Sequence, residues 1–543
     1  MKRIFVTILA LVALATSGAH AQYSGLLANR SDMTVGDMAN ISQTQFQYGT
    51  ARSMAIAGAM TSLGGDATSM AINPAGIGMY NGNEFTITPI LSIHSAKNSA
   101  PVSYGDNGNT NFGLSNVAAV VNLHNAKSNS GLVSVNFGFG YTKLADLNYN
   151  YSFQSQSVGS SSSIGQFFAD QLNSEGLSLS TVSASNNWSN IPATAWGAAL
   201  GYQVGWTDYD SGSSSWGAGW IDSGATVDHY TTIESRGYVG EYDMSLGMNF
   251  GNKLYIGATV SLMDLSQTLY YDYAEEFPDN NNADYAMNYA YYNQAVVLSG
   301  SGVNFKLGVT YRPTPELRIG MAVHTPTYYS VDREYQAAAS SSVYVSTSTP
   351  ASGINPDNSG NAYFSEETEI LADYAEYGWE FTSPTRLMWG VSYIIAKRGF
   401  LSVDYERAWY NGIRLKSAPY GVNTYDYKVQ AKSYFQGSNT LRIGAEFKVT
   451  PAMAVRAGYG FNDGMLQSSS ATTYSVDSPT VESVNYYSCG LGFVLSDYAS
   501  LDFAYMYQNY SFSDYQLFSV EGGEVFSTEI NTHNIAMTLA LKF

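Results

Sequence analysis

The sequence contains few cysteines and histidines, the residues that form disulfides, metal sites and many catalytic centres. Its single cysteine, Cys489, cannot form an internal disulfide and has no second thiol with which to hold a metal. The six histidines are far apart, follow no metal-ligand spacing, and accompany no Gly-x-Ser-x-Gly nucleophile motif at a strand-to-helix turn. We therefore expect no enzymatic activity and no cofactor.

Positive charge and long apolar runs are scarce as well. The 543 residues include 25 Lys and Arg against 44 Asp and Glu, which gives a formal net charge of −19. This balance argues against a nucleic-acid partner, because such proteins need basic patches. No stretch beyond the N-terminus reaches the roughly 20 uninterrupted apolar residues that a membrane-spanning helix needs.

The first 21 residues have the pattern of a secretory signal peptide. Lys2 and Arg3 form the charged region, residues 4–15 form a short apolar core, and Ala19-His20-Ala21 fits the small-x-small cleavage pattern. We expect cleavage between Ala21 and Gln22. No cysteine follows that position, so a lipoprotein anchor is not expected.

What is abundant is period-two alternation of apolar and polar residues, which begins after Tyr80 and continues to the C-terminus. It predicts an all-β fold, a 14-stranded antiparallel transmembrane β-barrel over residues 83–543. The predicted strands are 83–94, 111–123, 132–144, 237–250, 253–265, 296–311, 317–328, 381–395, 400–409, 440–449, 453–461, 484–494, 500–508 and 533–543. Short connections follow the even-numbered strands and longer ones the odd-numbered strands, which places both barrel ends in the periplasm. The 44 tyrosines suit the aromatic girdles of such a barrel.

Charged residues fall on the polar face of these strands, opposite the apolar face. In a membrane barrel the polar face points into the lumen, so this face would carry both signs of charge. Arg318, Arg386, Arg442 and Arg456 are candidate partners for a ligand carboxylate. The alternative for each is an internal salt bridge, and an arginine without an acidic partner would be the exception.

Residues 22–82 precede the first strand, and 52–80 are rich in glycine, alanine and serine. Interior glycines cost about 0.5–1 kcal/mol each in a helix, so this stretch suits a tightly folded plug inside the barrel. It contains Leu63-Gly64-Gly65-Asp66-Ala67 and, further on, Asn73-Pro74-Ala75-Gly76. The two motifs, just before the first strand, resemble the N-terminal hatch of the FadL/TodX family of outer-membrane transporters.

The resemblance implies passive uptake of hydrophobic compounds, such as long-chain fatty acids or aromatic hydrocarbons. A ligand would be captured by external loops, bound in a pocket gated by the hatch, and released sideways through the wall into outer-membrane lipid. In the family the third strand is kinked to make a side opening, and Gly138 and Gly140 lie in the third strand here. The terminal Phe543 resembles the signal by which the barrel-assembly machinery recognises its substrates.

The longest connection, 145–236, is the candidate capture loop. Phe167, Phe168, Trp196 and Leu200 lie in two segments with helical patterns, and could either meet a ligand or pack the loop against itself.

Two other functions remain open. A plugged barrel could serve as a structural or adhesive surface protein that works through its long polar loops. A general diffusion porin is less favoured, because a plug would block a water-filled channel. We expect a monomer, since a barrel of this size closes on its own.

Overall fold

The fold is seen in a computed structural model. It describes residues 26–27, 30–45, 48–100, 102–103, 107–126, 130–159, 162–183, 188–222, 224–282, 284–346, 356–368, 371–372, 378–419, 422–467, 478–518 and 524–543. Within these ranges, fourteen antiparallel wall strands close into one barrel, as the alternation predicted. No helix in the described ranges is long and apolar enough to cross a membrane. The predicted signal peptide lies outside the described residues.

The wall strands follow one another in chain order, and three of them are interrupted, so that two elements make one strand. They are β1 (Glu84–Asn98), β3 (Gly108–Asn125), β4 (Leu132–Asp146), β8 (Thr226–Phe250), β9 (Leu254–Glu276), β10 (Tyr285–Tyr311), β11 (Leu317–His324) with β12 (Tyr328–Val345), β15 (Trp379–Thr382) with β16 (Arg386–Ile395), β17 (Gly399–Trp409) with β18 (Arg414–Ser417), β19 (Gly437–Thr450), β20 (Met453–Asn462), β21 (Val481–Ser496), β22 (Ala499–Tyr515) and β23 (Phe526–Lys542). The first strand pairs with the last, which closes the sheet into a barrel.

The two faces of the wall differ as the alternation predicted. On β19, Leu441, Ile443 and Phe447 are 39%, 37% and 51% exposed, whereas Arg442 between them is 1% exposed. Apolar side chains therefore point outward and charged ones inward, which is the arrangement of a barrel in lipid rather than of a water-soluble sandwich.

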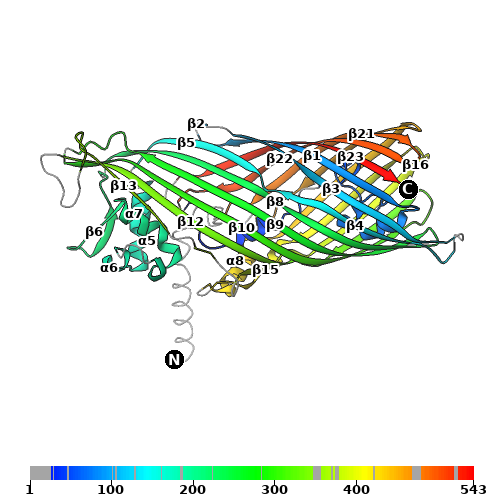
Figure 1. Ribbon diagram of the computed structural model, residues 1–543, viewed down its shortest axis with the longest axis horizontal. Helices are drawn as coiled ribbons and strands as arrows, with labels where there is room; N and C mark the ends of the chain where they lie inside the picture. The colour runs from blue at the N-terminus through cyan, green and yellow to red at the C-terminus, as the bar shows by residue number, and fades with distance from the viewer. Residues whose placement is uncertain are drawn as a thin grey trace, which may run out of the picture.

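Several strands continue far beyond the length that a bilayer requires. β8, β9 and β10 have 25, 23 and 27 residues, and a tilted strand crosses a membrane with about 9–11. We call the part beyond the membrane the extracellular extension. Figure 1 shows it at the end opposite the short turns, with β13 (Asn361–Glu367) at its tip. The strands of the extension are longer than the sequence predicted. Outside the membrane their polar, Tyr-rich sequence resembles that of a coil.

The long segment 145–236 is only partly a loop. β5 (Tyr149–Gly159) and the first residues of β8 form a ladder in the extension. Between them lies a helical module, made of the described residues 162–183, 188–222 and 224–225, that packs on the strands (Figure 1). Its elements are α5 (Ile164–Glu175), α6 (Leu179–Val182), the short 3-10 helices Trp188–Asn190 and Ala193–Ala195, α7 (Trp196–Gln203), β6 (Thr207–Asp210) and β7 (Ser215–Ala218).

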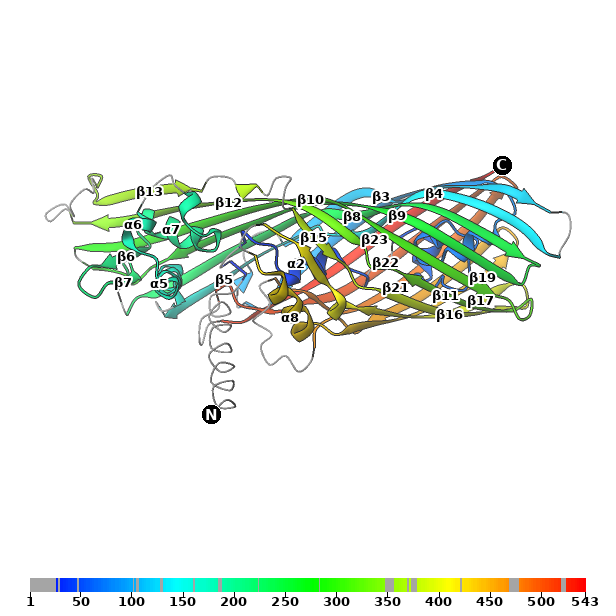
Figure 2. The same cartoon turned by 90° about the horizontal axis from the view of Figure 1, so that it is seen from below.

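The described residues before β1, 26–27, 30–45 and 48–80, form the N-terminal segment; they lie against the inner face of the wall, and Figure 2 shows their blue elements within the barrel. These are α2 (Val35–Ile41), α3 (Ala51–Ala55), α4 (Ser69–Ile72) and the 3-10 helix η1 (Pro74–Met79). Wall glycines leave room for it. A Cβ at Gly257 would overlap the backbone of Pro74, and one at Gly308 would overlap the side chain of Asn73.

Candidate functional site

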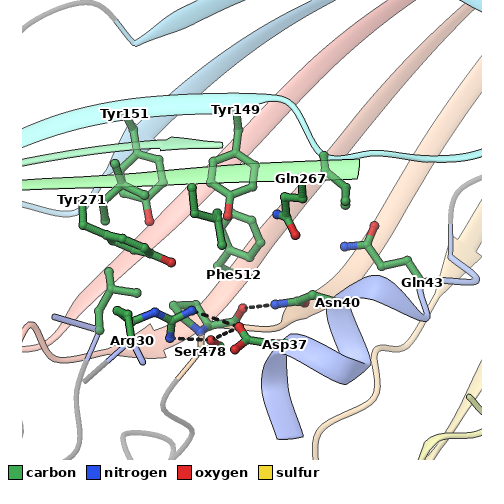
Figure 3. A pocket seen from close by; sticks show the side chains of 15 residues that line it. Arg30, Asp37, Asn40, Gln43, Tyr149, Tyr151, Gln267, Tyr271, Ser478 and Phe512 are labelled. Carbon is green, nitrogen blue, oxygen red and sulfur yellow. Dashed lines mark hydrogen bonds and ion pairs between the residues drawn. The ribbon is translucent and has the colours of Figure 1, made fainter. Parts of the chain in front are cut away.

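A small inner cavity of about 30 Å³ lies between the N-terminal segment and the wall. Its wall side is aromatic: Tyr149 and Tyr151 come from β5, Tyr271 from β9 and Phe512 from β22. Figure 3 shows these rings facing α2 across the cavity. The volume holds about one water molecule, so the cavity is closed to any larger ligand until something moves.

The polar side of the inner cavity is an internal ion pair. Arg30 Nη2 lies 3.0 Å from Asp37 Oδ1, and Ser478 hydrogen-bonds both side chains (Figure 3). Burial raises the pKa of the Asp37 carboxyl, but Arg30 and Arg333 outweigh it and hold that pKa below its usual value. The Asp37 carboxylate therefore stays ionised between two guanidinium groups, and Arg333 itself donates to the carbonyl oxygens of Ser31 and Arg30.

A second and larger space lies in the wall. The ladder between β3 and β4 runs from Asn125 and Ser134 to Asn116 and Thr142 and joins none of the described residues beyond that pair. Further out, β5 is paired with β2 (Val102–Ser103) instead. The interruption leaves a lateral groove of about 840 Å³, lined by Phe112, Gly113, Leu114, Tyr141, Lys143 and Asn148 among others. Phe112 is 77% exposed, so the groove opens to the outside of the barrel.

One short stretch of chain, the β4–β5 junction, separates the groove from the inner cavity. Leu147 lines the inner cavity, and the next residue, Asn148, lines the groove. The junction is tied to Gly237 of β8: Leu147 N and Asn148 Nδ2 each donate to Gly237 O at 3.0 Å, and Gly237 N donates to Asn148 Oδ1 at 3.1 Å. Opening this stretch would connect the two spaces.

The junction also carries a buried charge cluster. Asp146 Oδ2 accepts a 2.6 Å hydrogen bond from Lys143 Nζ, and His94 Nε2 of β1 lies 3.7 Å from Asp146 Oδ1. Tyr48 of the N-terminal segment covers the Lys143 ammonium at 5.5 Å. The cluster therefore joins three parts of the chain at the point where the wall ladder is interrupted.

Three of the four predicted carboxylate-binding arginines are paired within the protein. Arg386 and Arg442 share Glu406, at 2.6 and 2.8 Å, and Arg456 lies 2.7 Å from Glu446 and 2.6 Å from Asp502. These are the internal salt bridges that the sequence left open as the alternative.

Arg318 is the exception. It forms no ion pair in the described part of the chain, and its Nη1 donates to the carbonyl oxygen of Leu63 in the N-terminal segment. It lies next to the 312–316 turn, at the far end of the barrel from the extension.

The predicted hatch residues lie close together in one hydrogen-bonded turn. Asp66 accepts from Thr50 Oγ1 and from Thr68 N, each at 2.9 Å, and Asn73 Oδ1 caps η1 through Ala75 N at 3.1 Å, with Pro74 at the first position. Gly64 and Gly65 have φ values of 64° and 65°, and Gly65 N donates to Gly76 O at 3.0 Å. The motif residues thus shape the turn that folds 63–79 back on itself.

Gly138 and Gly140, predicted to permit the side opening, lie beside this segment. A Cβ at either position would press on the Met70 side chain, so both glycines make room for the N-terminal segment. The interruption of the ladder begins just beyond them, after Thr142. That they shape the opening stays a prediction.

The four aromatic and aliphatic residues of the predicted capture loop are buried. Phe167, Phe168, Trp196 and Leu200 are 1%, 0%, 3% and 0% exposed, and form the core of the helical module. The Phe168 ring stacks on Trp206 at 6.2 Å. They pack the loop against itself, so none of them faces an approaching ligand in this state.

The module is anchored by an acid that sequence analysis missed. Glu275, in the extension, accepts from Ile164 N at the start of α5 at 2.6 Å and from Tyr273 OH at 2.7 Å. Its burial raises the pKa of the carboxyl to about 8, although both hydrogen bonds lower it. His229 lies 3.9 Å away, and burial lowers the pKa of its imidazole to about 4.

Neither the groove nor the junction could be found from sequence. Alternation continues through β3 and β4 without a break, and only the pairing partners reveal the interruption. Asn148 and Gly237 are 89 positions apart and carry no local motif.

Comparison with known proteins gives matches by structure alone. No protein-family model and no curated protein sequence matches the chain. A FadL homologue of Pseudomonas aeruginosa is similar at a TM-score of 0.50 and 12% identity, with 92% of this chain and 99% of that chain covered. The toluene transporters TodX of Pseudomonas putida and TbuX of Ralstonia pickettii match at TM-scores of 0.49 and 0.45 and 13% and 15% identity, each over 92% of this chain and 99% of its own.

The closed barrel of fourteen antiparallel strands is thus the fold of a FadL-type outer-membrane protein.

Proposed function

We propose that the protein is an outer-membrane channel for passive uptake of hydrophobic compounds, and that it is not an enzyme. The observation that carries this proposal is the pair of spaces on either side of the β4–β5 junction: an aromatic-lined cavity inside and a groove of about 840 Å³ open to the outside. A ligand that is poorly soluble in water would move from the first to the second and leave into lipid without crossing the polar lumen. The printed names of the structural neighbours, toluene transporters and a FadL homologue, are compatible with this function.

In this proposal the N-terminal segment is the hatch. Its residues pack against inward-facing wall residues in three buried clusters, which supports a role in closing the lumen. Access to the inner cavity requires α2 or the β4–β5 junction to shift, because the closed cavity holds only about one water. The helical module would cover the external mouth and capture ligand by moving, since its aromatic core is buried.

Neutral aromatic hydrocarbons suit the inner cavity better than fatty acids. Four aromatic rings line it, and its one cation, Arg30, is held by Asp37. A carboxylate ligand would have to compete with Asp37 for Arg30 and Arg333, at the cost of burying a second negative charge.

Equilibrium binding tests the proposal. The purified barrel in detergent would be titrated with a radiolabelled aromatic hydrocarbon, a long-chain fatty acid and a water-soluble sugar. We expect saturable binding of the hydrocarbon, weaker binding of the fatty acid, and none of the sugar. Tyr271→Ala should weaken hydrocarbon binding by about tenfold, because one stacked ring contributes on the order of 1 kcal/mol or more. The exposed Tyr363→Ala is the matched control. If no hydrophobic compound binds saturably, the channel proposal fails.

The alternative, an adhesive surface protein, has one observation in its favour. The outer face of the extension carries exposed tyrosines, Tyr270, Tyr289 and Tyr291, next to acidic side chains. Binding of whole cells or polysaccharide to the protein, with no ligand in the titration above, would favour it.

A further inference from the structure

The turns at the periplasmic end of the barrel differ in charge from the rest of the chain. The whole sequence has a net charge of −19, yet the described residues of this end carry seven cations against four carboxylates. The cations are Lys253, Arg312, Arg318, Lys397, Arg398, Lys448 and Lys542, and the carboxylates are those of Glu84, Glu316 and Asp497 and the terminal one at Phe543. The short turns and the C-terminus lie at this end (Figure 1), so it faces the periplasmic leaflet.

Three of these cations gather on two neighbouring turns. Lys397 and Arg398 form the turn between β16 and β17, and Lys448 lies near the end of β19. Lys448 N donates a 2.7 Å hydrogen bond to Arg398 O, which holds the two turns side by side. All three side chains are exposed, and in the described part of the chain none of them forms an ion pair. Their mutual repulsion is therefore uncompensated within the protein.

Apolar side chains flank this basic triad on the lipid side. Ile395 precedes the first turn and is 54% exposed, and Phe447 and Val449, which precede and follow Lys448 and lie on the other face of β19, are 51% and 54% exposed. Acyl chains cover such residues in a membrane, so the three cations stand at the height of the headgroups. A surface that offers cations at headgroup height and apolar side chains just above has the chemistry of a phospholipid site.

The opposite rim of the apolar belt has different chemistry. There, tyrosine hydroxyls and acidic side chains meet: Tyr238 OH donates to Asp264 at 2.8 Å, and Asn439 hydrogen-bonds Asp463. At this rim these acceptors and carboxylates lie next to the apolar belt, whereas at the periplasmic rim Lys397, Arg398 and Lys448 do.

We propose that Lys397, Arg398 and Lys448 bind the phosphate headgroup of an anionic phospholipid in the periplasmic leaflet. The lipid neutralises the triad and fixes the depth of the barrel on that side. This inference concerns the membrane interface and does not depend on which compound the channel takes up.

Native mass spectrometry of the detergent-purified, full-length barrel tests it. The protein would be titrated with phosphatidylglycerol and with phosphatidylcholine of the same acyl chains. We expect the anionic lipid to bind at least about tenfold more tightly than the zwitterionic one, because each basic side chain near a charged membrane surface adds to the attraction. The triple variant Lys397→Gln/Arg398→Gln/Lys448→Gln should lose that preference.

The matched control removes three exposed lysines from the opposite end, Lys416→Gln/Lys428→Gln/Lys432→Gln, and should keep the preference. Both variants would first be shown to be folded by the heat-dependent shift of the barrel on a gel. Equal binding of the two lipids by the unaltered protein, or an unchanged preference in the triad variant, would overturn the proposal. Displacement of phosphatidylglycerol by excess inorganic phosphate would show a free-phosphate site instead, and would also overturn it.

Discussion

Charged side chains in the lumen share ion-pair partners in a way that their positions in the sequence do not indicate. Glu406 is 1% exposed and accepts contacts from two arginines on neighbouring strands, Arg386 and Arg442. Alternation alone places all three inside the barrel, but the sharing of one carboxylate depends on strand register. Each charge in such a group is stable only while its partners remain.

Removing the shared carboxylate should therefore destabilise the barrel. For Glu406→Gln we expect a loss of about 3–5 kcal/mol in the free energy of unfolding, because two arginines lose their common counter-charge in a buried site. The measurement is urea-induced unfolding in detergent, followed by tryptophan fluorescence. Glu367→Gln, an exposed acid in β13, should change it by less than about 0.5 kcal/mol. Equal effects of the two substitutions would show that the lumen pairs contribute little.

The docking of the helical module should depend on pH through Glu275. Its pKa is raised from about 4.5 to about 8 in the folded protein, so the folded state favours the protonated form. The protonated carboxyl therefore stabilises the docked module fully below about pH 4.5, and this stabilisation is lost as the pH rises towards and past 8. The pKa of His229 is lowered to about 4, so its effect on stability changes only between about pH 4 and 6.5. Above pH 6.5 the change in stability is due to Glu275.

We expect amide protection factors in α5, corrected for intrinsic exchange, to fall between pH 6.5 and 9. Glu275→Gln keeps an acceptor for Ile164 N but does not ionise, so its protection should change little over the same range. The exposed neighbour Glu276→Gln should behave like the unaltered protein. A fall of the same size in Glu275→Gln would exclude this carboxyl as the cause.

At the scale of elements, the N-terminal segment and the wall fit through glycines. Gly257 and Gly308 lie on inner faces of β9 and β10, where Pro74 and Asn73 come into contact with the wall. The sequence shows the glycines and the Asn-Pro pair, but not that they meet. This contact is one of several that hold the first part of the chain against the wall.

Adding one methyl group at that contact should loosen the segment. For Gly257→Ala we expect about 1–3 kcal/mol of destabilisation, because the new Cβ overlaps the Pro74 backbone, which cannot retreat. Hydrogen exchange should show faster exchange in residues 69–79. Gly113→Ala is the control, since no atom lies within 4 Å of a Cβ there. Unchanged exchange in Gly257→Ala would mean that the segment is held elsewhere.

Much of the whole molecule could be predicted from the sequence, and the reason is physical. A membrane barrel repeats one pattern, apolar outward and polar inward, so all fourteen wall strands could be located. Outside the membrane that constraint ends, and the prediction fails to find β5 and the outer parts of β8, β9 and β10. Sites defined by pairing, such as the lateral groove and the Arg386–Glu406–Arg442 group, depend on the register between neighbouring strands, which alternation does not encode.

The central claim is that hydrophobic compounds leave through the lateral groove, and uptake by whole cells tests it most directly. Gly113→Trp would fill the groove, since the position has open space around it, and Gly82→Trp is an equally unobstructed control away from the groove. The host would be a Gram-negative strain without its own hydrophobic-compound channel, and the probe a radiolabelled aromatic hydrocarbon.

The unaltered protein and Gly82→Trp should both raise the initial uptake rate saturably over empty vector. Gly113→Trp should lower that rate at least about tenfold while the purified variant still binds the hydrocarbon. Full uptake by folded Gly113→Trp, or no gain from the unaltered protein over empty vector, would contradict lateral release.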